Sequence, residues 1–204
     1  FSMESIIQTF NGTVGSGVST VTATISRNGD LVSNLWLDVL LPVSGGSVAV
    51  GDYINWTNNT GHALVKECEI EIGGQRIDRH YSQWLDVYNE LTDHEESEWI
   101  GLNKHAAKNP YLKSGLRTGA EEVTRLYVPL KFWFCRNPGL ALPLIALQYH
   151  EVKLKLTTRG LAGLVNVKGN LTPPDNAPSC DLYADYIYLD TDERRRFAQV
   201  SHEY

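Results

Sequence analysis

Residues 69–78 read Glu-Ile-Glu-Ile-Gly-Gly-Gln-Arg-Ile-Asp, and this stretch decides the fold class. Before the glycine pair, apolar and acidic side chains fall on opposite faces: Cys68, Ile70 and Ile72 against Glu67, Glu69 and Glu71. A period of two is typical of a strand that buries one face. Gly73-Gly74 then supplies the positive φ angles that a tight reversal needs. The stretch therefore predicts a β-hairpin, with Gln75–Asp78 as its return strand.

A second alternation lies near the N-terminus, where three apolar residues alternate with threonine and serine in the range Thr20–Ser26. Asn28-Gly29 follows, a dipeptide typical of two-residue hairpin turns. We therefore expect a hairpin whose partner strand is Leu31–Leu41. The side chains of that strand expected to share one face are Leu35, Leu37, Val39 and Leu41.

Strand signals recur along the rest of the chain. Further strands are expected at residues 5–10, 53–56, 64–72, 123–134, 144–156 and 182–189, with a weaker one at 161–167. Residues 81–91 change to a helical period, with Ser82 as the expected N-cap and one apolar stripe formed by Trp84, Val87, Tyr88 and Leu91. Residues 101–120 are rich in Gly, Asn, Lys and Pro and are expected to form a long surface loop.

Many strands, one helical segment and no regular alternation of strands with helices favour an all-β fold. The chain has 204 residues, enough for one domain with a substantial core. The predicted fold is an antiparallel eight-stranded jelly-roll sandwich with a short helical insertion.

Composition restricts the possible partners. The net charge of -6 argues against binding nucleic acid through phosphate neutralisation. Cys68, Cys135 and Cys180 form no CxxC pair, and the first two lie in apolar strand contexts that predict small buried side chains. No apolar run approaches the ~20 residues of a membrane helix. The chain begins with Phe1 and ends in Ser-His-Glu-Tyr204, so both ends are expected to be cuts in a longer protein.

Catalytic and metal-binding motifs were sought among the six histidines: His62, His80, His94, His105, His150 and His202. The sequence contains no HxH pair of the kind a metal-binding cupin uses and no HExxH motif. No Ser-His-Asp arrangement is evident, and no phosphate-loop lysine follows Gly73-Gly74. We therefore expect no catalytic residue, no cofactor, no metal and no enzyme activity. The basic run Arg194–Arg196 follows three acidic residues and is expected to be a solvated linker or a salt-bridge site.

Two further sets of residues are candidate sites. The sequons at Asn11, Asn55, Asn58 and Asn170 are possible glycosylation sites, used only if the chain meets an oligosaccharyl transferase. Trp56, Trp99 and Trp133 are candidate anchors of a protein interface, because tryptophan is enriched at interface hot spots. The alternative for each tryptophan is a core or rim position without a partner chain.

Several stretches occur together and in a recognisable order. They include the Ile-Gly-Gly hairpin, Pro-Leu-Lys-Phe-Trp-Phe at 129–134, Ala-Leu-Pro-Leu-Ile-Ala-Leu at 141–147 and Glu-Arg-Arg-Arg-Phe-Ala-Gln at 193–199. Each is a weak motif alone, but as an ordered set they run nearly from end to end. In this the chain resembles the N-terminal jelly-roll portion of the major capsid protein of large icosahedral nucleocytoplasmic DNA viruses.

The resemblance implies a structural protein of a viral capsid. Residues 1–190 would be the first jelly roll, and residues 191–204 a linker toward a second jelly roll absent from this chain. Members of the family form homotrimers with a pseudo-hexagonal outline that tile an icosahedral shell. The implied partners are neighbouring capsomers and minor capsid proteins, with no direct nucleic-acid contact and only indirect contact with an internal membrane layer. The implied location is the virion capsid, assembled in the host cell cytoplasm.

Three alternatives stay open from the sequence. A single jelly roll could bind glycans through its loops, or it could form the vertex (penton) protein of a capsid. A cupin-like enzyme is the third possibility, and stoichiometric metal would be its mark.

Overall fold

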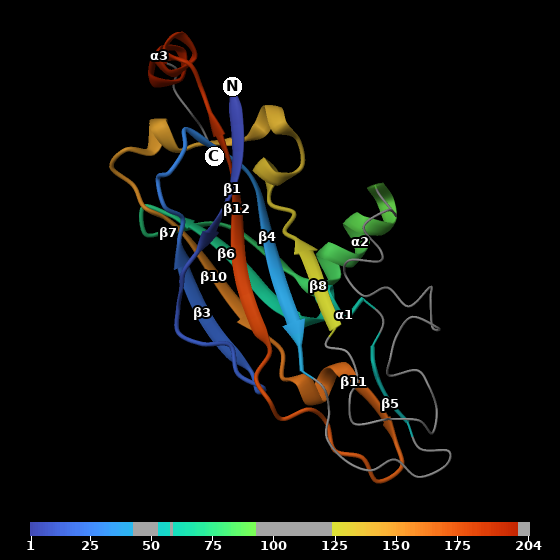
Figure 1. Ribbon diagram of the computed structural model, residues 1–204. Coiled ribbons are helices and arrows are strands. Elements are labelled where there is room, and N and C mark those ends of the chain that lie inside the picture. The colour runs from blue at the N-terminus through green and yellow to red at the C-terminus, as the bar shows by residue number, and fades with distance from the viewer. Residues whose placement is uncertain (43–52, 58, 93–123, 200–204) are drawn as a thin grey trace.

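The computed structural model describes residues 1–42, 53–57, 59–92 and 124–199, in which two antiparallel sheets face one another (Figure 1). The first sheet has the order β1-β12-β4-β8. Its strands are β1 (Ser2–Gln8), β12 (Ser179–Tyr188), β4 (Leu31–Leu41) and β8 (Thr124–Pro129), and the short β9 (Leu142–Pro143) also pairs with β4.

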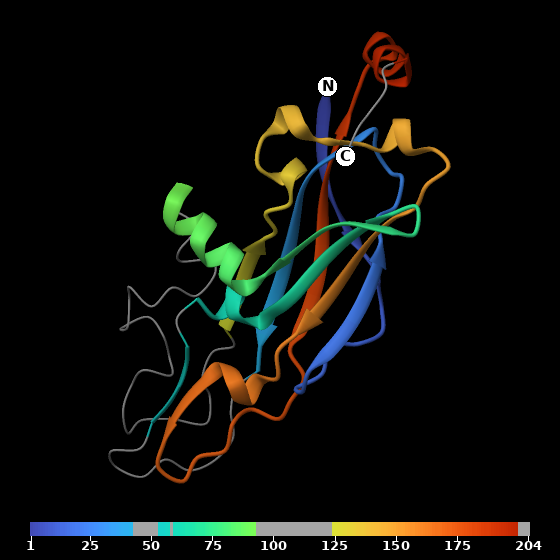
Figure 2. The same ribbon diagram turned by 180° about the vertical axis from the view of Figure 1, so that it is seen from behind.

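The second sheet has the order β2-β3-β10-β6-β7. Its strands are β2 (Phe10–Asn11), β3 (Ser19–Thr24), β10 (Val152–Thr158), β6 (Val65–Ile72) and β7 (Gln75–Tyr81). A separate ribbon pairs β5 (Tyr53–Trp56) with β11 (Val165–Lys168) at one end of the sandwich, and the view from behind in Figure 2 shows the same placement.

The helical elements in the described part of the chain are short. The α-helices are α1 (Thr60–Leu64), α2 (Ser82–Thr92) and α3 (Thr191–Gln199), and the 3-10 turns are η4 (Trp133–Cys135), η5 (Pro138–Leu140), η6 (Leu144–Leu147) and η7 (Leu161–Leu164). Among the described residues no helix has the length and apolar character needed to cross a membrane.

The strand pairing is nested. Strand β1 pairs with β12, β3 with β10, β4 with β8, and β6 with β7, so that early strands pair with late ones and only the middle pair is a local hairpin. A doubled ribbon of this kind, wrapped into two facing sheets, is a jelly roll. The prediction of an all-β, antiparallel eight-stranded jelly-roll sandwich is confirmed, and α2 lies in the insertion between β7 and β8.

The core lies between the inward faces of the two sheets. The predicted inward face of β4 is confirmed, because Leu35, Leu37, Val39 and Leu41 are completely buried. The facing sheet contributes equally buried side chains: Cys68, Ile70, Leu154 and Leu156. Full burial of one aliphatic side chain stabilises a fold by roughly 1.5–3 kcal/mol, so the interface between the sheets is the main source of stability.

The Ile-Gly-Gly hairpin is also confirmed, as the connection between β6 and β7. Gly73 and Gly74 have φ angles of 60° and 82°. Two consecutive positive φ angles are what a two-residue turn of type I′ requires, and glycine adopts them without steric cost.

The hairpin predicted at Asn28-Gly29 is wrong. Strand β3 belongs to the second sheet and β4 to the first, so residues 25–30 cross from one sheet to the other. The backbone N–H of Ile25 donates to Val152 in the second sheet, and that of Asp30 donates to Ile187 in the first. Gly29 does not have a positive φ. Glycine is instead needed at position 29 because the backbone packs closely against the buried Tyr186: a Cβ there would lie 2.8 Å from the Cβ of that residue.

Several predicted strands are shorter than their apolar alternation suggests. Strand β8 ends at Pro129 instead of continuing to Phe134, since proline has no N–H for the ladder and the chain then forms η4. Residues 144–147 form η6, so the predicted strand at 144–156 begins only at Val152. The predicted strand at 5–10 divides between two sheets, because β1 ends at Gln8 and β2 joins β3.

The crossing at residues 25–30 leads to a prediction about stability. Replacing Gly29 by alanine should destabilise the fold by about 1–3 kcal/mol, because the new methyl group must displace the packed Tyr186 ring. Gly17→Ala is the matched control, since a Cβ at Gly17 meets nothing within 4 Å and its φ is not positive. Urea denaturation measures both. Equal midpoints for Gly29→Ala and Gly17→Ala would show that the contact with Tyr186 is unimportant.

Candidate functional site

The described residues contain no cluster that could hold a metal, since no group of three or more His, Cys, Asp or Glu side chains converges there. His62 is buried, and its Nδ1 lies 2.6 Å from the carboxylate of Asp86. His80 is buried and His150 is exposed. His94, His105 and His202 lie outside the described residues.

The three cysteines are free thiols. Cys68 is fully buried, as predicted, and Cys135 packs against the core from a half-buried position. Burial raises the pKa of the Cys135 and Cys180 thiols to about 12 and raises that of Cys68 well above its usual value. Because the thiolate is the reactive form, these cysteines are structural side chains rather than nucleophiles.

The predicted glycosylation sites have different positions. Asn11 in β2 and Asn170 beyond β11 are exposed. Asn55 belongs to β5, but its side chain is outside the described part, and Asn58 lies outside it altogether. Exposure makes Asn11 and Asn170 accessible to modification, so their glycosylation stays a prediction.

The three candidate tryptophan anchors are not brought together. Trp56 is only 2% exposed and belongs to the core, which agrees with the core alternative. Trp133 is half-buried in η4, and its ring meets that of Phe134 edge-on at 5.0 Å. Trp99 lies outside the described residues.

The strongest candidate surface is instead the outward face of helix α2. The predicted helix is confirmed, but Ser82 is its first residue rather than its N-cap, and its hydroxyl accepts a hydrogen bond from Arg159. The helix buries Ser82, Leu85 and Asn89. The apolar stripe predicted from the sequence is only partly covered: Trp84 and Tyr88 are half-buried, whereas Val87 is 51% and Leu91 79% exposed. We call Trp84, Val87, Tyr88 and Leu91 the α2 stripe.

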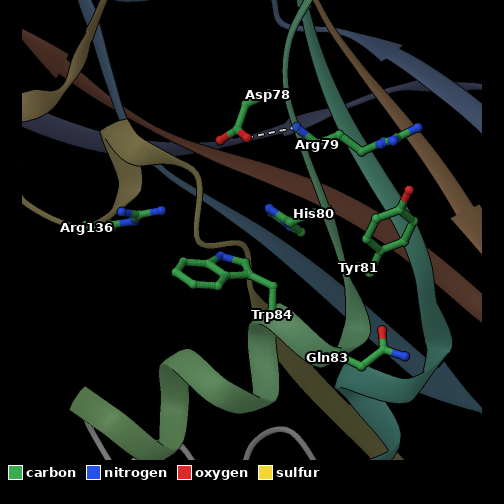
Figure 3. Close-up of a pocket in the computed structure, with 7 residues that line it drawn as sticks. All are labelled: Asp78, Arg79, His80, Tyr81, Gln83, Trp84 and Arg136. Atoms are coloured by element: carbon green, nitrogen blue, oxygen red, sulfur yellow. Dashed lines mark hydrogen bonds between the residues drawn. The ribbon is translucent and has the colours of Figure 1, made fainter.

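A hollow of about 490 Å³ adjoins the α2 stripe, between α2, β7 and the end of η4 (Figure 3). It is lined by Asp78, Arg79, His80, Tyr81, Gln83, Trp84 and Arg136. The Trp84 indole N–H donates to the carbonyl of Lys131, which ties the helix to the segment after β8. Arg136 stacks over the rings of Trp84 and Tyr88, at 5.1 and 5.4 Å from their centroids.

A second hollow, of about 510 Å³, lies on the outward face of the first sheet. Its charged side chains are paired within the chain. Arg125 donates two hydrogen bonds to the carboxylate of Asp38, at 2.9 and 3.0 Å. Trp36 donates from its indole nitrogen to Asp185 at 2.9 Å. Arg125 thus compensates the charge of Asp38, and the carboxylate of Asp185 already accepts a hydrogen bond within the chain.

The third surface feature is the start of α3, after the last strand. Asp190 and Glu193 form a reciprocal capping box, in which each carboxylate accepts the backbone N–H of the other residue. The side chain of Asp30 accepts from the backbone N–H of Leu189 at 2.7 Å and from Nε of Arg194 at 3.0 Å. Asp30 is 7% exposed, so a buried carboxylate fixes the direction in which the chain leaves the barrel.

Sequence reasoning missed Arg136 and His80 as parts of a surface site. The sequence patterns assigned no role to Arg136, and His80 was considered only as one of six histidines. The apolar stripe on α2 was visible, but the periodicity of a helix does not say whether its apolar face meets the barrel or the solvent. The orientation of α2 is seen from the burial of Leu85 and Asn89. That burial depends on the tertiary structure, which the periodicity of the helix does not contain.

Comparisons with known proteins agree with the fold. Residues 1–190 match the family described as major capsid protein N-terminus. The chain is 50% identical over 205 residues to the major capsid protein of Pyramimonas orientalis virus, covering 100% of this chain and 48% of that protein. It is 42% identical to the major capsid protein of Paramecium bursaria Chlorella virus 1, covering 100% of this chain and 44% of that one.

Solved structures give the same result. The capsid protein in the quasi-atomic model of the PBCV-1 virus capsid superposes with a TM-score of 0.75 and 38% identity, over 100% of this chain and 46% of that chain. The Faustovirus major capsid protein, at 13% identity and a TM-score of 0.68 over 96% of this chain and 56% of that chain, shares the fold.

The chain spans about half the length of the relatives that it matches. These relatives are structural proteins, which confirms the expectation that the chain is not part of an enzyme. The match of residues 1–190, the high identities and the shared jelly roll place this chain in the major capsid protein family of large DNA viruses, in the region that forms the N-terminus of its members.

Proposed function

We propose that this chain is the first of two jelly rolls in a subunit that assembles as a homotrimer, and that three such subunits form a pseudo-hexagonal capsomer of an icosahedral shell. The observation that carries the proposal is the nested eight-stranded barrel, whose strands run from Ser2 to Tyr188, in a chain that spans about half the length of the relatives. The other half of such a relative is similar in length to this chain, which is enough for a second barrel.

Residues 1–190 are the first jelly roll in this proposal, and residues 191–204 lead toward the second. The anchoring of α3 supports this division. The capping box at Asp190 starts a new helix immediately after the barrel, and the buried carboxylate of Asp30 holds that helix in one direction. A linker with a fixed exit direction would set the orientation of whatever follows it.

The partners in this proposal are other copies of the subunit, neighbouring capsomers and minor capsid proteins of the virion. The net charge of -6 is consistent with a shell protein that does not bind nucleic acid directly, and any contact with an internal membrane layer would be indirect. Assembly would take place in the host cell cytoplasm, where free thiols such as Cys68, Cys135 and Cys180 persist.

The proposed assembly predicts a definite mass. The complete polypeptide that carries this chain, expressed and purified, should give a trimer in native mass spectrometry, because permanent subunit interfaces bury about 2,000 Å² or more and survive dilution. Negative-stain images should show particles with a hexagonal outline. A complete polypeptide that is monomeric at micromolar concentration would contradict the proposed function.

The anchoring of α3 gives a second prediction. Asp30→Asn removes the charge that Arg194 and Leu189 contact, and hydrogen bonds to a charged group contribute about 1.5–3 kcal/mol. Backbone amides of residues 191–199 should therefore exchange with deuterium faster, while those of β4 stay protected. Asp192→Asn, at an exposed position in the first turn of the same helix, is the control. Unchanged exchange in the Asp30 variant would mean that α3 is held by other contacts.

A further inference from the structure

The α2 stripe is the first of three observations that point to a contact surface. An amphipathic helix normally turns its apolar stripe toward its own core. Here α2 buries only Leu85 among its large apolar side chains and directs Val87 and Leu91 into the solvent. Trp84 and Tyr88 lie beside them, with ring centroids 5.5 Å apart. The helix therefore holds apolar surface that the described part of the barrel does not cover.

The second observation is the state of Arg136 in the adjoining hollow. Its guanidinium is exposed and is held by stacking over Trp84 and Tyr88. Among its contacts with described residues, no hydrogen bond or ion pair engages this guanidinium. Arg79 lines the same hollow, but its Nη1 lies 3.4 Å from Glu67 and 3.9 Å from Glu69. Arg136 thus presents unused donors in a fixed orientation, the geometry that binds a carboxylate through two parallel hydrogen bonds.

The third observation is His80, which lines the same hollow as Arg136. Figure 3 shows the two side chains pointing toward one another above the indole of Trp84. His80 is 4% exposed, its ring stacks on Phe132 at 4.4 Å, and neither ring nitrogen has a hydrogen-bond partner among the described residues. Burial, with a further contribution from the charge of Arg136, lowers the pKa of His80 to about 4. The imidazole is therefore neutral at pH 7, and its one N–H donor is buried without a partner among the described residues.

Charge indicates which partner fits. The hollow is lined by two arginines and one aspartate, and because Arg79 is paired with Glu67 and Glu69, Arg136 is the cation that remains to meet a partner on a chain whose net charge is -6. A carboxylate is the complementary group, and acidic side chains outnumber basic ones by 24 to 18 in the chain itself. Trp, Tyr and Arg are also the residue types that dominate protein interface hot spots, and all three meet here. Exposed apolar side chains beside an arginine without an ion pair suit a protein partner better than a small anion.

We propose that the α2 stripe and the Arg136 hollow form a contact surface for a second copy of the protein, with a carboxylate of the neighbouring subunit bound to Arg136 and its apolar side chains covering Val87 and Leu91. This rests on the proposed function, because it names where the subunits of that assembly touch. The neighbour contributes a different part of its surface, so the contact is head-to-tail, which is the type that closes into a ring.

The test is a charge reversal in the complete polypeptide. Arg136→Glu should weaken subunit association at least tenfold, measured by mass photometry on dilution, with only a small shift in the melting temperature of the barrel, because Arg136 is exposed and loses only its contacts with the Trp84 and Tyr88 rings. Lys66→Glu is the matched control, since Lys66 is exposed on β6, does not line the hollow and undergoes the same change of charge. Arg136→Lys should have an intermediate effect, because it keeps the charge and loses the planar stacking group.

Leu91→Asp is a second variant that does not depend on Arg136. Leu91 is 79% exposed, so the change leaves the barrel intact and should weaken association by a similar factor. If the wild-type protein is trimeric and neither Arg136→Glu nor Leu91→Asp weakens it, the proposed contact surface is wrong while the proposed function stands. A monomeric wild-type protein would instead overturn both.

The identity of the partner is tested by a photo-crosslinking residue at position 87 of the complete polypeptide, in assembled particles. A crosslinked product with twice the subunit mass, whose peptides all come from this protein and include an acidic surface segment, supports the proposal. Crosslinks only to a different capsid component, or no crosslink in particles that are fully assembled, would overturn it.

Discussion

The burial of one face of β4 is the constraint on which the rest of the structure depends. Strand β4 pairs with β12 along one edge and with β8 and β9 along the other, so it is the central strand of its sheet. Its four alternate side chains from Leu35 to Leu41 have no exposed surface. A shift of one residue in register would turn all of them to the solvent. The second sheet must cover this face. The nested pairing of early strands with late ones brings the two sheets face to face within one chain.

The sequence was sufficient to predict the features that depend on local periodicity. The alternation in β4 and β6 and the paired glycines before β7 each specify their structure within a few residues. The all-β class followed from these stretches. The identification of the jelly roll and of its family needed the ordered set of motifs as well, because periodicity alone does not say which strands pair.

The predictions that failed depend on contacts between distant residues. Asn28-Gly29 has the composition of a hairpin turn, yet the adjoining strands join different sheets because β3 pairs with β10 and β4 with β12. The alternation through Phe132 and Phe134 continues after β8 ends, since a 3-10 turn also buries both rings. In the same way, the stripe on α2 was recognised as apolar, but its direction depends on which residues the barrel leaves room to bury.

The start of β1 and the end of β12 lie at one end of the barrel, and the β5-β11 ribbon lies at the other (Figures 1 and 2). Ser2 pairs with Tyr188 in the register of β1 and β12, so the chain enters and leaves at the same end, close to α3. Figures 1 and 2 both show the β5-β11 ribbon at the other end. The ribbon end of the barrel is thus remote from Ser2 and from α3. Short foreign peptides inserted near Gly169, beyond the exposed Lys168, would be displayed at that end, away from the β1-β12 edge and from α3.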